Sequence, residues 1–259
     1  MRKSRTLAKI RAGEPVRICG LGHFIPAFIC LAAEHGYDCV WLDLEHRAMG
    51  DREVQALMPL FHLYDIDCML RAPTLEKTRL YRYLEDGATG LMIPHVSTPE
   101  KAEMLVQATK FPPLGDRGFD GAGLDCKFFL EGGFEYCSEA NEETFLAVQI
   151  ETPEAVRNVD EIAAIPGVDA LFVGPADLSL RIQNSDCGFT VHEAQQMVAD
   201  AAKKHNKAWG QPAPTPEELQ RLADMGAQLL SHGGDFGGIL NILKESSATF
   251  DEVYGPRGS

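Results

Sequence analysis

Positive charge is scarce in this 259-residue chain: 24 lysines and arginines stand against 38 aspartates and glutamates, for a net charge of −14. An acidic surface repels phosphate backbones, so we expect no nucleic-acid partner. No apolar run approaches the ~20 residues that a membrane span needs, so we expect no membrane partner. The opening stretch, residues 1–11, is basic but lacks the apolar core of a secretory signal, and we expect a cytoplasmic protein.

Several catalytic signatures are also missing from the sequence. The seven cysteines are scattered without any Cys-x-x-Cys pair, which disfavours a zinc site and favours reduced core residues. There is no Gly-x-Ser-x-Gly elbow and no P-loop. No expected strand carries a lysine toward its C-terminal end, where Schiff-base chemistry would need one. Metal-assisted chemistry on a carbonyl compound remains the best fit.

Short apolar runs bounded by turn residues alternate along the chain with stretches of helical periodicity, and such runs predict buried parallel strands. The expected strands are 16–20, 39–43, 68–71, 90–93, 146–151, 170–173, 208–210 and 228–231. The expected helices are 51–62, 76–86, 99–110, 153–165, 191–205, 216–225 and 238–245. This alternation predicts a (β/α)8 TIM barrel, an α/β fold, as a single domain over residues 1–259.

Two features qualify that prediction. A doubly wound sheet is the alternative fold, but the first turn, Gly20-Leu21-Gly22, lacks the third glycine of a dinucleotide-binding loop. The stretch 111–141 breaks the rhythm, because it is long, glycine-rich and aromatic. A loop of this length inside a compact domain is usually functional, as a lid or an interface element. The last residues, 255–259, are expected to be disordered.

Acidic side chains and a histidine follow three of the expected strands, where a barrel places its chemistry. Glu151 ends one strand and Asp177 follows another, so their oxygens suit a hard divalent cation such as Mg²⁺, with Mn²⁺ or Co²⁺ as alternatives. The competing interpretation is that both acids cap helices. His46 follows Asp43 and Glu45 after a third strand and is a candidate general base, or else a solvated loop histidine.

Further candidates lie at other strand ends. Arg71 can hold a carboxylate or stabilise an oxyanion, or it can simply pair with a neighbouring acid such as Asp43 or Glu45. The turn 174–177 opens a possible helix whose backbone N–H groups would bind a carboxylate. The turn 233–235 offers a similar anion nest or a plain tight turn. Three more histidines fall at strand ends and are candidates to line the pocket: His23, His95 and His232.

The order and spacing of these pieces resemble the HpcH/HpaI aldolase family, the metal-dependent class II 2-keto-3-deoxy sugar-acid aldolases. The resemblance covers about residues 11–243 and is carried by 42–46, 71–73, 111–113 with 115–118, 148–151 and 173–178. It implies a barrel of the phosphoenolpyruvate/pyruvate type. It further implies a divalent cofactor (Mg²⁺, Mn²⁺ or Co²⁺), a small-molecule substrate and a homo-oligomer, typically a hexamer that exchanges helices between neighbours.

The resemblance also implies roles for individual residues. Glu151 and Asp177 would hold the metal, and Arg71 would contact the keto oxygen and stabilise the enolate. Gln149 would position the substrate and a metal-bound water. The pyruvate carboxylate would lie against the backbone of Gly174, Pro175, Ala176 and Asp177.

His46 would transfer a proton. The family's orienting aspartate aligns with Glu85, which Asp86 follows directly, so the partner of His46 stays open between the two. The implied reaction is reversible retro-aldol cleavage of a 4-hydroxy-2-oxo acid to pyruvate and an aldehyde. Alternatives are decarboxylation of a 2-keto diacid, citrate-lyase-like cleavage of an acyl-CoA, and a non-catalytic barrel that binds a keto acid. His95 and His232 depart from the commonest family pattern near the expected aldehyde half of the site.

Overall fold

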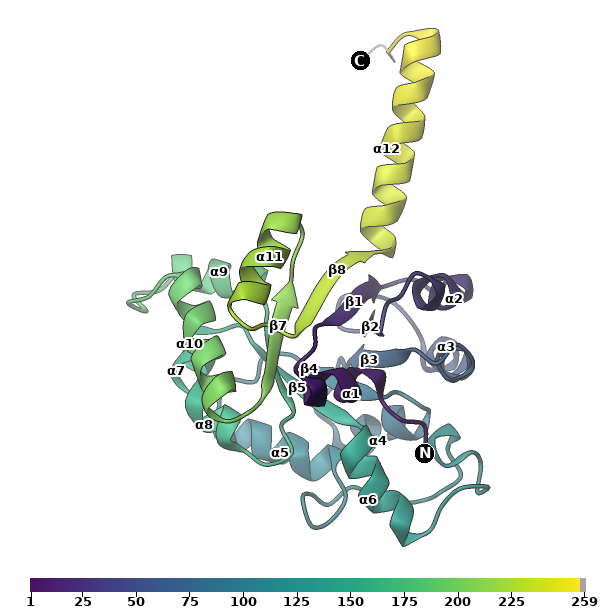
Figure 1. The fold of residues 1–259 in the computed structure, drawn as a ribbon, viewed down its shortest axis with the longest axis vertical. Coiled ribbons are helices and arrows are strands. Elements are labelled where there is room, and N and C mark those ends of the chain that lie inside the picture. The colour runs from purple at the N-terminus through teal and green to yellow at the C-terminus, as the bar shows by residue number, and fades with distance from the viewer. Residues whose placement is uncertain (257–259) are drawn as a thin grey trace.

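The computed structural model of the chain describes residues 1–256. Its centre is a closed barrel in which parallel strands follow one another in chain order and the last pairs with the first (Figure 1). The strands are β1 (Val16–Leu21), β2 (Cys39–Asp43), β3 (Asp67–Arg71), β4 (Gly90–Ile93), β5 (Phe145–Ile150), β6 (Ala170–Val173), β7 (Ala208–Pro212) and β8 (Leu229–Gly234). The predicted (β/α)8 class is confirmed.

Helices surround the barrel, and several begin where the sequence predicted. Thr98, Thr152 and Thr215 each cap a helix whose first residue is proline. The helices are α1 (Arg5–Ala12), α2 (Pro26–Glu34), α3 (Asp51–Leu63), α4 (Lys77–Glu85), α5 (Pro99–Thr109), the 3-10 helix η1 (Leu124–Cys126), α6 (Phe134–Glu143), α7 (Pro153–Arg157), α8 (Val159–Ala164), α9 (Pro175–Gln183), α10 (Val191–Lys204), α11 (Pro216–Asp224) and α12 (Asp235–Tyr254).

The core has two layers, one between the helices and the barrel and one inside the barrel. Phe145 and Ala147 of β5 face the interior, and Leu7 of α1 packs into the same cluster. Because side chains alternate along a strand, the same alternation carries Gln149 and then Glu151 toward the mouth of the barrel. Regular strand geometry therefore brings these polar groups to one rim.

The segment 111–141 is less irregular than predicted, because it contains η1 and most of α6. Phe111, Cys126 and Tyr136 form a small core of their own. Within it, the Arg117 guanidinium donates to Asp125 at 2.8 Å, and the Tyr136 hydroxyl donates to the same carboxylate. Aromatic and ionic contacts thus order most of this segment.

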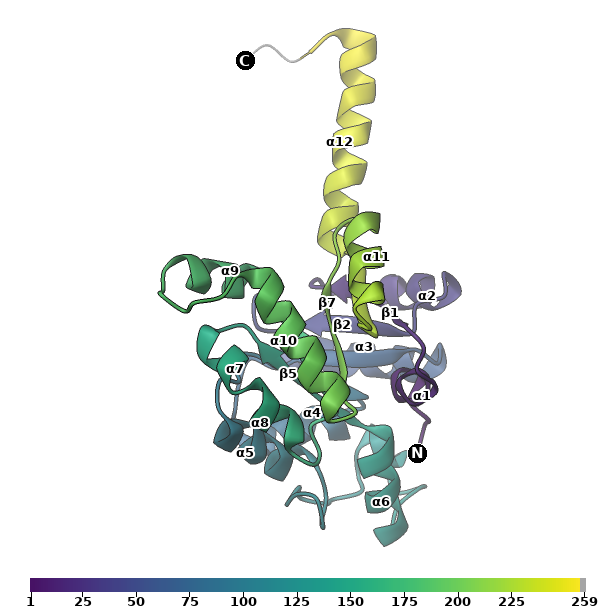
Figure 2. The ribbon, with the colours of Figure 1, turned by 60° about the vertical axis from the view of Figure 1, so that its left-hand side comes forward.

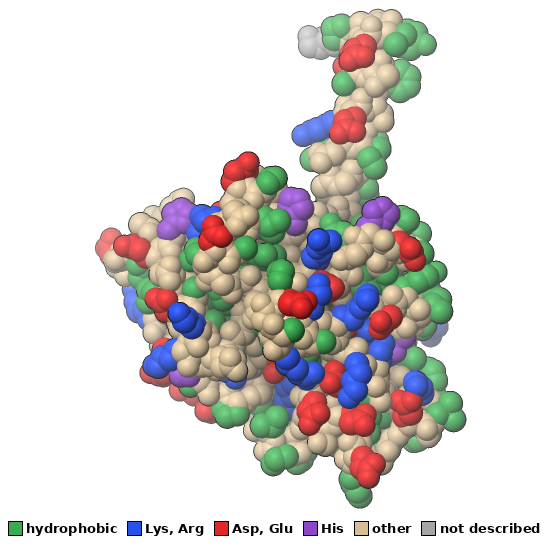
Figure 3. Space-filling view, in the orientation of Figure 1, with side chains coloured by type: hydrophobic (Ala, Val, Ile, Leu, Met, Phe, Trp, Pro, Cys, Tyr) green, Lys and Arg blue, Asp and Glu red, His purple; other side chains and the backbone are tan. Residues whose placement is uncertain are grey.

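Helix α12 leaves the barrel instead of packing against it, as both ribbon views show (Figures 1 and 2). The predicted helix 238–245 was too short: the helix begins at Asp235 and continues to Tyr254, since neither proline nor glycine follows Gly238 until Gly255. Large apolar side chains are exposed along it (Figure 3), among them Ile242, Leu243 and Phe250. Of the expected tail 255–259, residues 257–259 lie outside the described part. No helix in residues 1–256 combines the length and apolarity needed to cross a bilayer.

Candidate active site at the barrel mouth

Arg71 is fixed at the rim by two carboxylates and an aromatic ring. Asp43 and Arg71 are register partners on β2 and β3, and their side chains form a two-pronged pair through Nε (2.9 Å) and Nη2 (2.7 Å). Arg71 Nη1 lies 3.1 Å from Glu45 Oε2, and the guanidinium stacks 4.6 Å from the centre of the Trp41 ring. Arg71 therefore forms the ion pairs with Asp43 and Glu45 that the sequence suggested. Since the guanidinium has five N–H donors, the pair still leaves donors for a ligand.

Asp43 also shapes the turn that carries His46. Its Oδ1 accepts the backbone N–H of Glu45 at 3.0 Å and, at 3.4 Å, that of His46. Burial opposes ionisation of Asp43, but the hydrogen bonds and charge of Arg71 hold the pKa of this carboxyl below its ordinary value. The His46 side chain is 56% exposed, and its Nε2 lies 3.7 Å from Glu45 Oε2. The imidazole is accessible at the rim, as a base toward substrate would need.

Glu151 is a buried carboxylate with few donors around it. Its Oε1 accepts the backbone N–H of His95 at 2.6 Å, and its Oε2 lies 3.4 Å from Gln149 Nε2. Burial raises the pKa of Glu151, the His95 contacts oppose that rise, and the nearby charges of Asp177 and Glu45 add to it. A cation at this position would relieve the repulsion.

Asp177 opens α9 beside Glu151 and pairs with Arg181 at 2.5 Å, four residues along the helix. Gly174 lets the two elements approach, because a Cβ there would lie only 2.4 Å from Glu151 Oε2. No three His, Cys, Asp or Glu side chains within residues 1–256 form a ready-made metal site. Any cation held by Glu151 and Asp177 would need additional ligands.

Two buried polar atoms at this mouth lack a partner within the described residues, the indole N–H of Trp41 and the side-chain oxygen of Gln149. Buried polar groups are normally hydrogen-bonded, so the unpaired oxygen of Gln149, whose amide nitrogen lies 3.4 Å from Glu151 Oε2, indicates a place for water or ligand. Gln149 is nearly fully buried, which rules out simple exposure to bulk solvent as its partner.

The remaining strand-end histidines differ in what they contact. His95 follows β4 and reaches Glu151, its Nδ1 lying 2.9 Å from Oε1. His95 was expected to line the pocket, but its contact with Glu151 was not predicted. His23 lies 2.7 Å from Asp235, and His232 Nδ1 lies 2.6 Å from the carbonyl of Ala213. Among the hydrogen bonds and ion pairs of residues 1–256, neither of these two histidines reaches Glu151.

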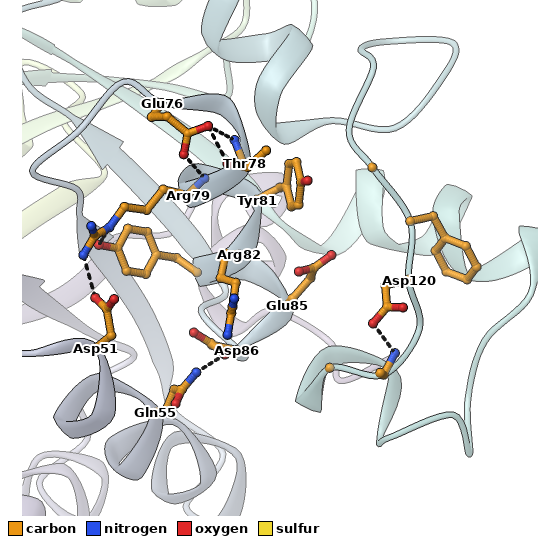
Figure 4. A pocket seen from close by; sticks show the side chains of 15 residues that line it. Asp51, Gln55, Glu76, Thr78, Arg79, Tyr81, Arg82, Glu85, Asp86 and Asp120 are labelled. Atoms are coloured by element: carbon orange, nitrogen blue, oxygen red, sulfur yellow. Dashed lines mark hydrogen bonds and ion pairs between the residues drawn. The ribbon is translucent and has the colours of Figure 1, made fainter.

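Glu85 and Asp86 lie elsewhere. They line a cavity of about 780 Å³ between α4 and residues 118–123 (Figure 4). Asp86 accepts a hydrogen bond from Gln55 at 2.9 Å, and burial raises the pKa of Glu85. The hydrogen bonds and ion pairs of residues 1–256 connect His46 to neither. The expected contact is therefore not made within one copy of the chain.

Comparison with known proteins identifies the architecture. The family model of the HpcH/HpaI aldolase/citrate lyase family matches residues 22–241. The chain belongs to the HpcH/HpaI aldolase/citrate lyase family. The predicted resemblance is confirmed, and this membership makes the protein a carbon–carbon lyase of the aldolase type.

Relatives within the HpcH/HpaI family cover almost the whole chain. A hydroxypyruvate/pyruvate aldolase of Delftia acidovorans is 34% identical over 248 residues, which is 93% of this chain and 88% of the relative. A 5-keto-4-deoxy-D-glucarate aldolase of Escherichia coli is 31% identical, with 83% and 84% covered. The crystal structure of an HpcH/HpaI aldolase from Desulfitobacterium hafniense superposes with a TM-score of 0.88 at 30% identity, covering 95% and 96% of the chains.

Proposed function

We propose that this HpcH/HpaI family member catalyses reversible aldol cleavage of a 4-hydroxy-2-oxo acid to pyruvate and an aldehyde. The observation that carries the proposal is the convergence of Arg71, His46 and buried Glu151 at one end of the barrel. The names of the relatives, a hydroxypyruvate/pyruvate aldolase and a ketodeoxyglucarate aldolase, support a keto-acid substrate.

Glu151 and Asp177 would hold the divalent cation, with Mg²⁺, Mn²⁺ or Co²⁺ as candidates. The donor set fits: both residues offer carboxylate oxygens, burial and then the charge of Asp177 raise the pKa of Glu151, and Gln149 Oε1 lacks a donor within the described residues. When bound, such a cation supplies Lewis-acid polarisation of the substrate's keto oxygen.

The protein side chains would complete the reaction. His46 would take the proton from the C4 hydroxyl as the C3–C4 bond breaks and the aldehyde leaves. The electron pair of that bond moves into the enolate of pyruvate, whose negative oxygen the free donors of Arg71 would stabilise. Protonation at C3 then yields pyruvate. Asp43 and Trp41 keep Arg71 in place throughout.

The start of α9 would bind the pyruvate carboxylate. Gly174 precedes the helix without a side-chain cap, and Pro175 is its first residue. The N–H groups of Ala176 and Asp177 fall in the first turn, where backbone donors lack partners in the helix and favour an anion. Gln149 would lie beneath the substrate, with its unpaired oxygen available to an ordered water.

Proton exchange tests this function without knowledge of the aldehyde. We expect the methyl protons of pyruvate to exchange with deuterium in NMR spectra when Mg²⁺, Mn²⁺ or Co²⁺ is present, and the exchange to stop with EDTA. A Glu151→Gln protein serves as the control. Turnover of oxaloacetate without exchange of pyruvate would favour the decarboxylase alternative, and an acyl-CoA lyase would show neither reaction.

We further propose that the chain is a cytoplasmic homo-oligomer, with the hexamer expected from the family resemblance. Support comes from α12, whose apolar side chains Ile242, Leu243 and Phe250 are each more than 60% exposed on a helix that projects from its own barrel. A second copy would bury them. Light scattering should give a mass that is a multiple of the 28.4 kDa chain, whereas a monomeric mass would contradict this part.

A further inference from the structure

We propose that His95 donates Nδ1 to the divalent cation held by Glu151 and Asp177, which makes the site a mixed nitrogen and oxygen site. This inference rests on the cation of the proposed function and extends it to a residue with no assigned role. It implies that the protein prefers Co²⁺ over Mg²⁺ more strongly than a site of oxygen ligands alone, because imidazole suits transition metals and Mg²⁺ favours oxygen.

The first argument is the distance between the two donor atoms. His95 Nδ1 and Glu151 Oε1 lie 2.9 Å apart. Adjacent ligands at a cation with bonds of about 2.1 Å are separated by about 3.0 Å when the angle between them is near 90°. The two atoms therefore share one side of the site at the spacing that a common cation would need. Glu151 Oε2, whose nearest donor is Gln149 at 3.4 Å, remains open to ligation.

The backbone holds the His95 ring in this position. His95 has a φ of +56°, in the left-handed region, where histidine, asparagine and aspartate are more common than other side chains. Its own N–H donates to Glu151 Oε1 at 2.6 Å, and its carbonyl accepts from Lys101 Nζ at 2.7 Å. Both contacts fix the turn after β4, so the ring is preorganised toward Glu151.

A carboxylate also lies near the second ring nitrogen of His95. His95 Nε2 lies 3.5 Å from Glu45 Oε1, and Glu45 is itself held by Arg71 at 3.1 Å. Histidines that bind metals commonly donate their other N–H to a carboxylate, which selects the tautomer with a free lone pair on the coordinating nitrogen. Glu45 would place the proton on Nε2 and leave Nδ1 free for the cation.

An independent observation points to a ligand at the same place. Gln149 is nearly fully buried, and its side-chain oxygen has no partner within residues 1–256. Its Nε2 faces Glu151, so the amide belongs to the same cluster. A water bound to the cation would donate to that oxygen. His95, Glu151 and the unpaired amide of Gln149 thus form one cluster, and a bound cation would have to draw the Asp177 carboxylate to it, since no three such side chains within residues 1–256 already surround a cation position.

The full-length His95→Asn variant tests the proposal, because asparagine tolerates the left-handed backbone and removes the imidazole. His232→Asn is the matched control, since His232 is another strand-end histidine but contacts the Ala213 carbonyl. With Mn²⁺ bound, we expect pulsed EPR to show histidine nitrogen coupling in the wild type and in His232→Asn, but not in His95→Asn. Calorimetry should show the ratio of Co²⁺ to Mg²⁺ affinity falling at least about tenfold in His95→Asn alone.

The outcomes separate this inference from the proposed function. Mn²⁺ that binds and supports pyruvate exchange without nitrogen coupling, or coupling that persists in His95→Asn, would overturn the role of His95 and leave the aldolase intact. Failure of the wild type to bind Mn²⁺, or equal binding by Glu151→Gln, would overturn both. Loss of coupling in His95→Asn with Mn²⁺ still bound would support His95 as a ligand.

Discussion

The two ends of the barrel each bury a carboxylate, but they treat it differently. At the amino end, Asp67 is fully buried, and its two oxygens accept from Arg2 at 2.5 Å, Ser4 Oγ at 2.7 Å and Thr6 N at 2.8 Å. At the carboxyl end, Glu151 faces other acids, and the neighbouring Gln149 oxygen lacks a partner within residues 1–256.

The contrast shows how to distinguish structure from function in one molecule. A buried charge whose hydrogen bonds are complete holds the chain together, here by tying residues 2–6 to the start of β3. A buried charge beside like charges, with a raised pKa, is typical of a site that awaits a ligand. Activity should therefore depend on Glu151, and stability on Asp67.

Glu151→Gln should produce the largest loss of activity. Removing the charge removes a ligand for the cation and several kcal/mol of transition-state stabilisation, so kcat/KM for retro-aldol cleavage should fall about a thousandfold or more. Thermal unfolding should stay unchanged or shift upward, because the variant no longer buries a charge or repels Asp177 and Glu45. Near-normal activity in this folded variant would refute the assigned role of Glu151.

Asp67→Asn should show the opposite pattern. Loss of the carboxylate leaves the largely buried Arg2 guanidinium with only the exposed Asp65 as an ion-pair partner, so the free energy of unfolding should fall by about 3 kcal/mol. The folded fraction should keep normal kcat. Urea titration measures the first quantity and steady-state kinetics the second. A stable but inactive variant would show that the two ends are not separable.

Arg71→Lys keeps the charge but loses the two-pronged contact with Asp43. We expect kcat for the aldol reaction to fall about a hundredfold, as for loss of one oxyanion donor. Affinity for the metal, measured by calorimetry, should change little because Arg71 does not ligate it. A large loss of metal affinity with normal kcat would assign Arg71 to the metal site instead.

Gly174→Ala should have a smaller effect, confined to the rim. The added methyl group would meet Glu151 Oε2 at 2.4 Å and push that carboxylate away, weakening metal affinity about tenfold. Gly132→Ala is the matched control, since nothing lies within 4 Å of a Cβ built there. Equal metal affinities in the two variants would argue that Glu151 moves freely.

The smallest expected effect is on the pH dependence of stability without metal. The pKa of Glu151 is raised by burial, so unfolding free energy should fall as pH rises from the ordinary carboxyl range through that raised value. At Asp43, burial raises the pKa, but the hydrogen bonds and charge of Arg71 lower it further, so the net pKa lies below its ordinary value. The stability that Asp43 contributes should therefore be lost as pH falls through this lowered pKa. Thermal melts recorded across the pH range measure both effects. The decrease in stability at rising pH should disappear in Glu151→Gln, and the decrease at falling pH should disappear in Asp43→Asn.

The barrel was predictable because each strand is a short apolar run that ends in turn residues. Strand alternation also predicts which polar residues gather: Gln149 and Glu151 continue the interior face begun by Phe145 and Ala147. The rim therefore follows from local pattern. The roles of these residues stay predictions that the variants above would test.

Other contacts depend on geometry that the sequence does not encode locally. The link from His95 to Glu151 depends on a left-handed backbone at His95. Asp177 pairs with Arg181 across one helical turn, a spacing that could have been noticed once α9 was assigned. The predicted length of α12 was wrong because its apolar residues do not follow a helical pattern that stops at a definite residue. Glu85 and Asp86 were paired with His46 by the family resemblance, which carries no distance information for this chain.

The contact between the Trp41 ring and the Arg71 guanidinium makes tryptophan fluorescence a probe of the barrel mouth. The chain has two tryptophans, and one of them, Trp41, has its ring 4.6 Å from the Arg71 guanidinium. The other, Trp209, is buried in the core between the barrel and the helices. The emission of Trp209 should therefore stay constant, whereas the emission of Trp41 should change when an anion approaches Arg71. Occupancy at the barrel mouth could then be followed in unlabelled protein, with Trp41→Phe providing the background emission.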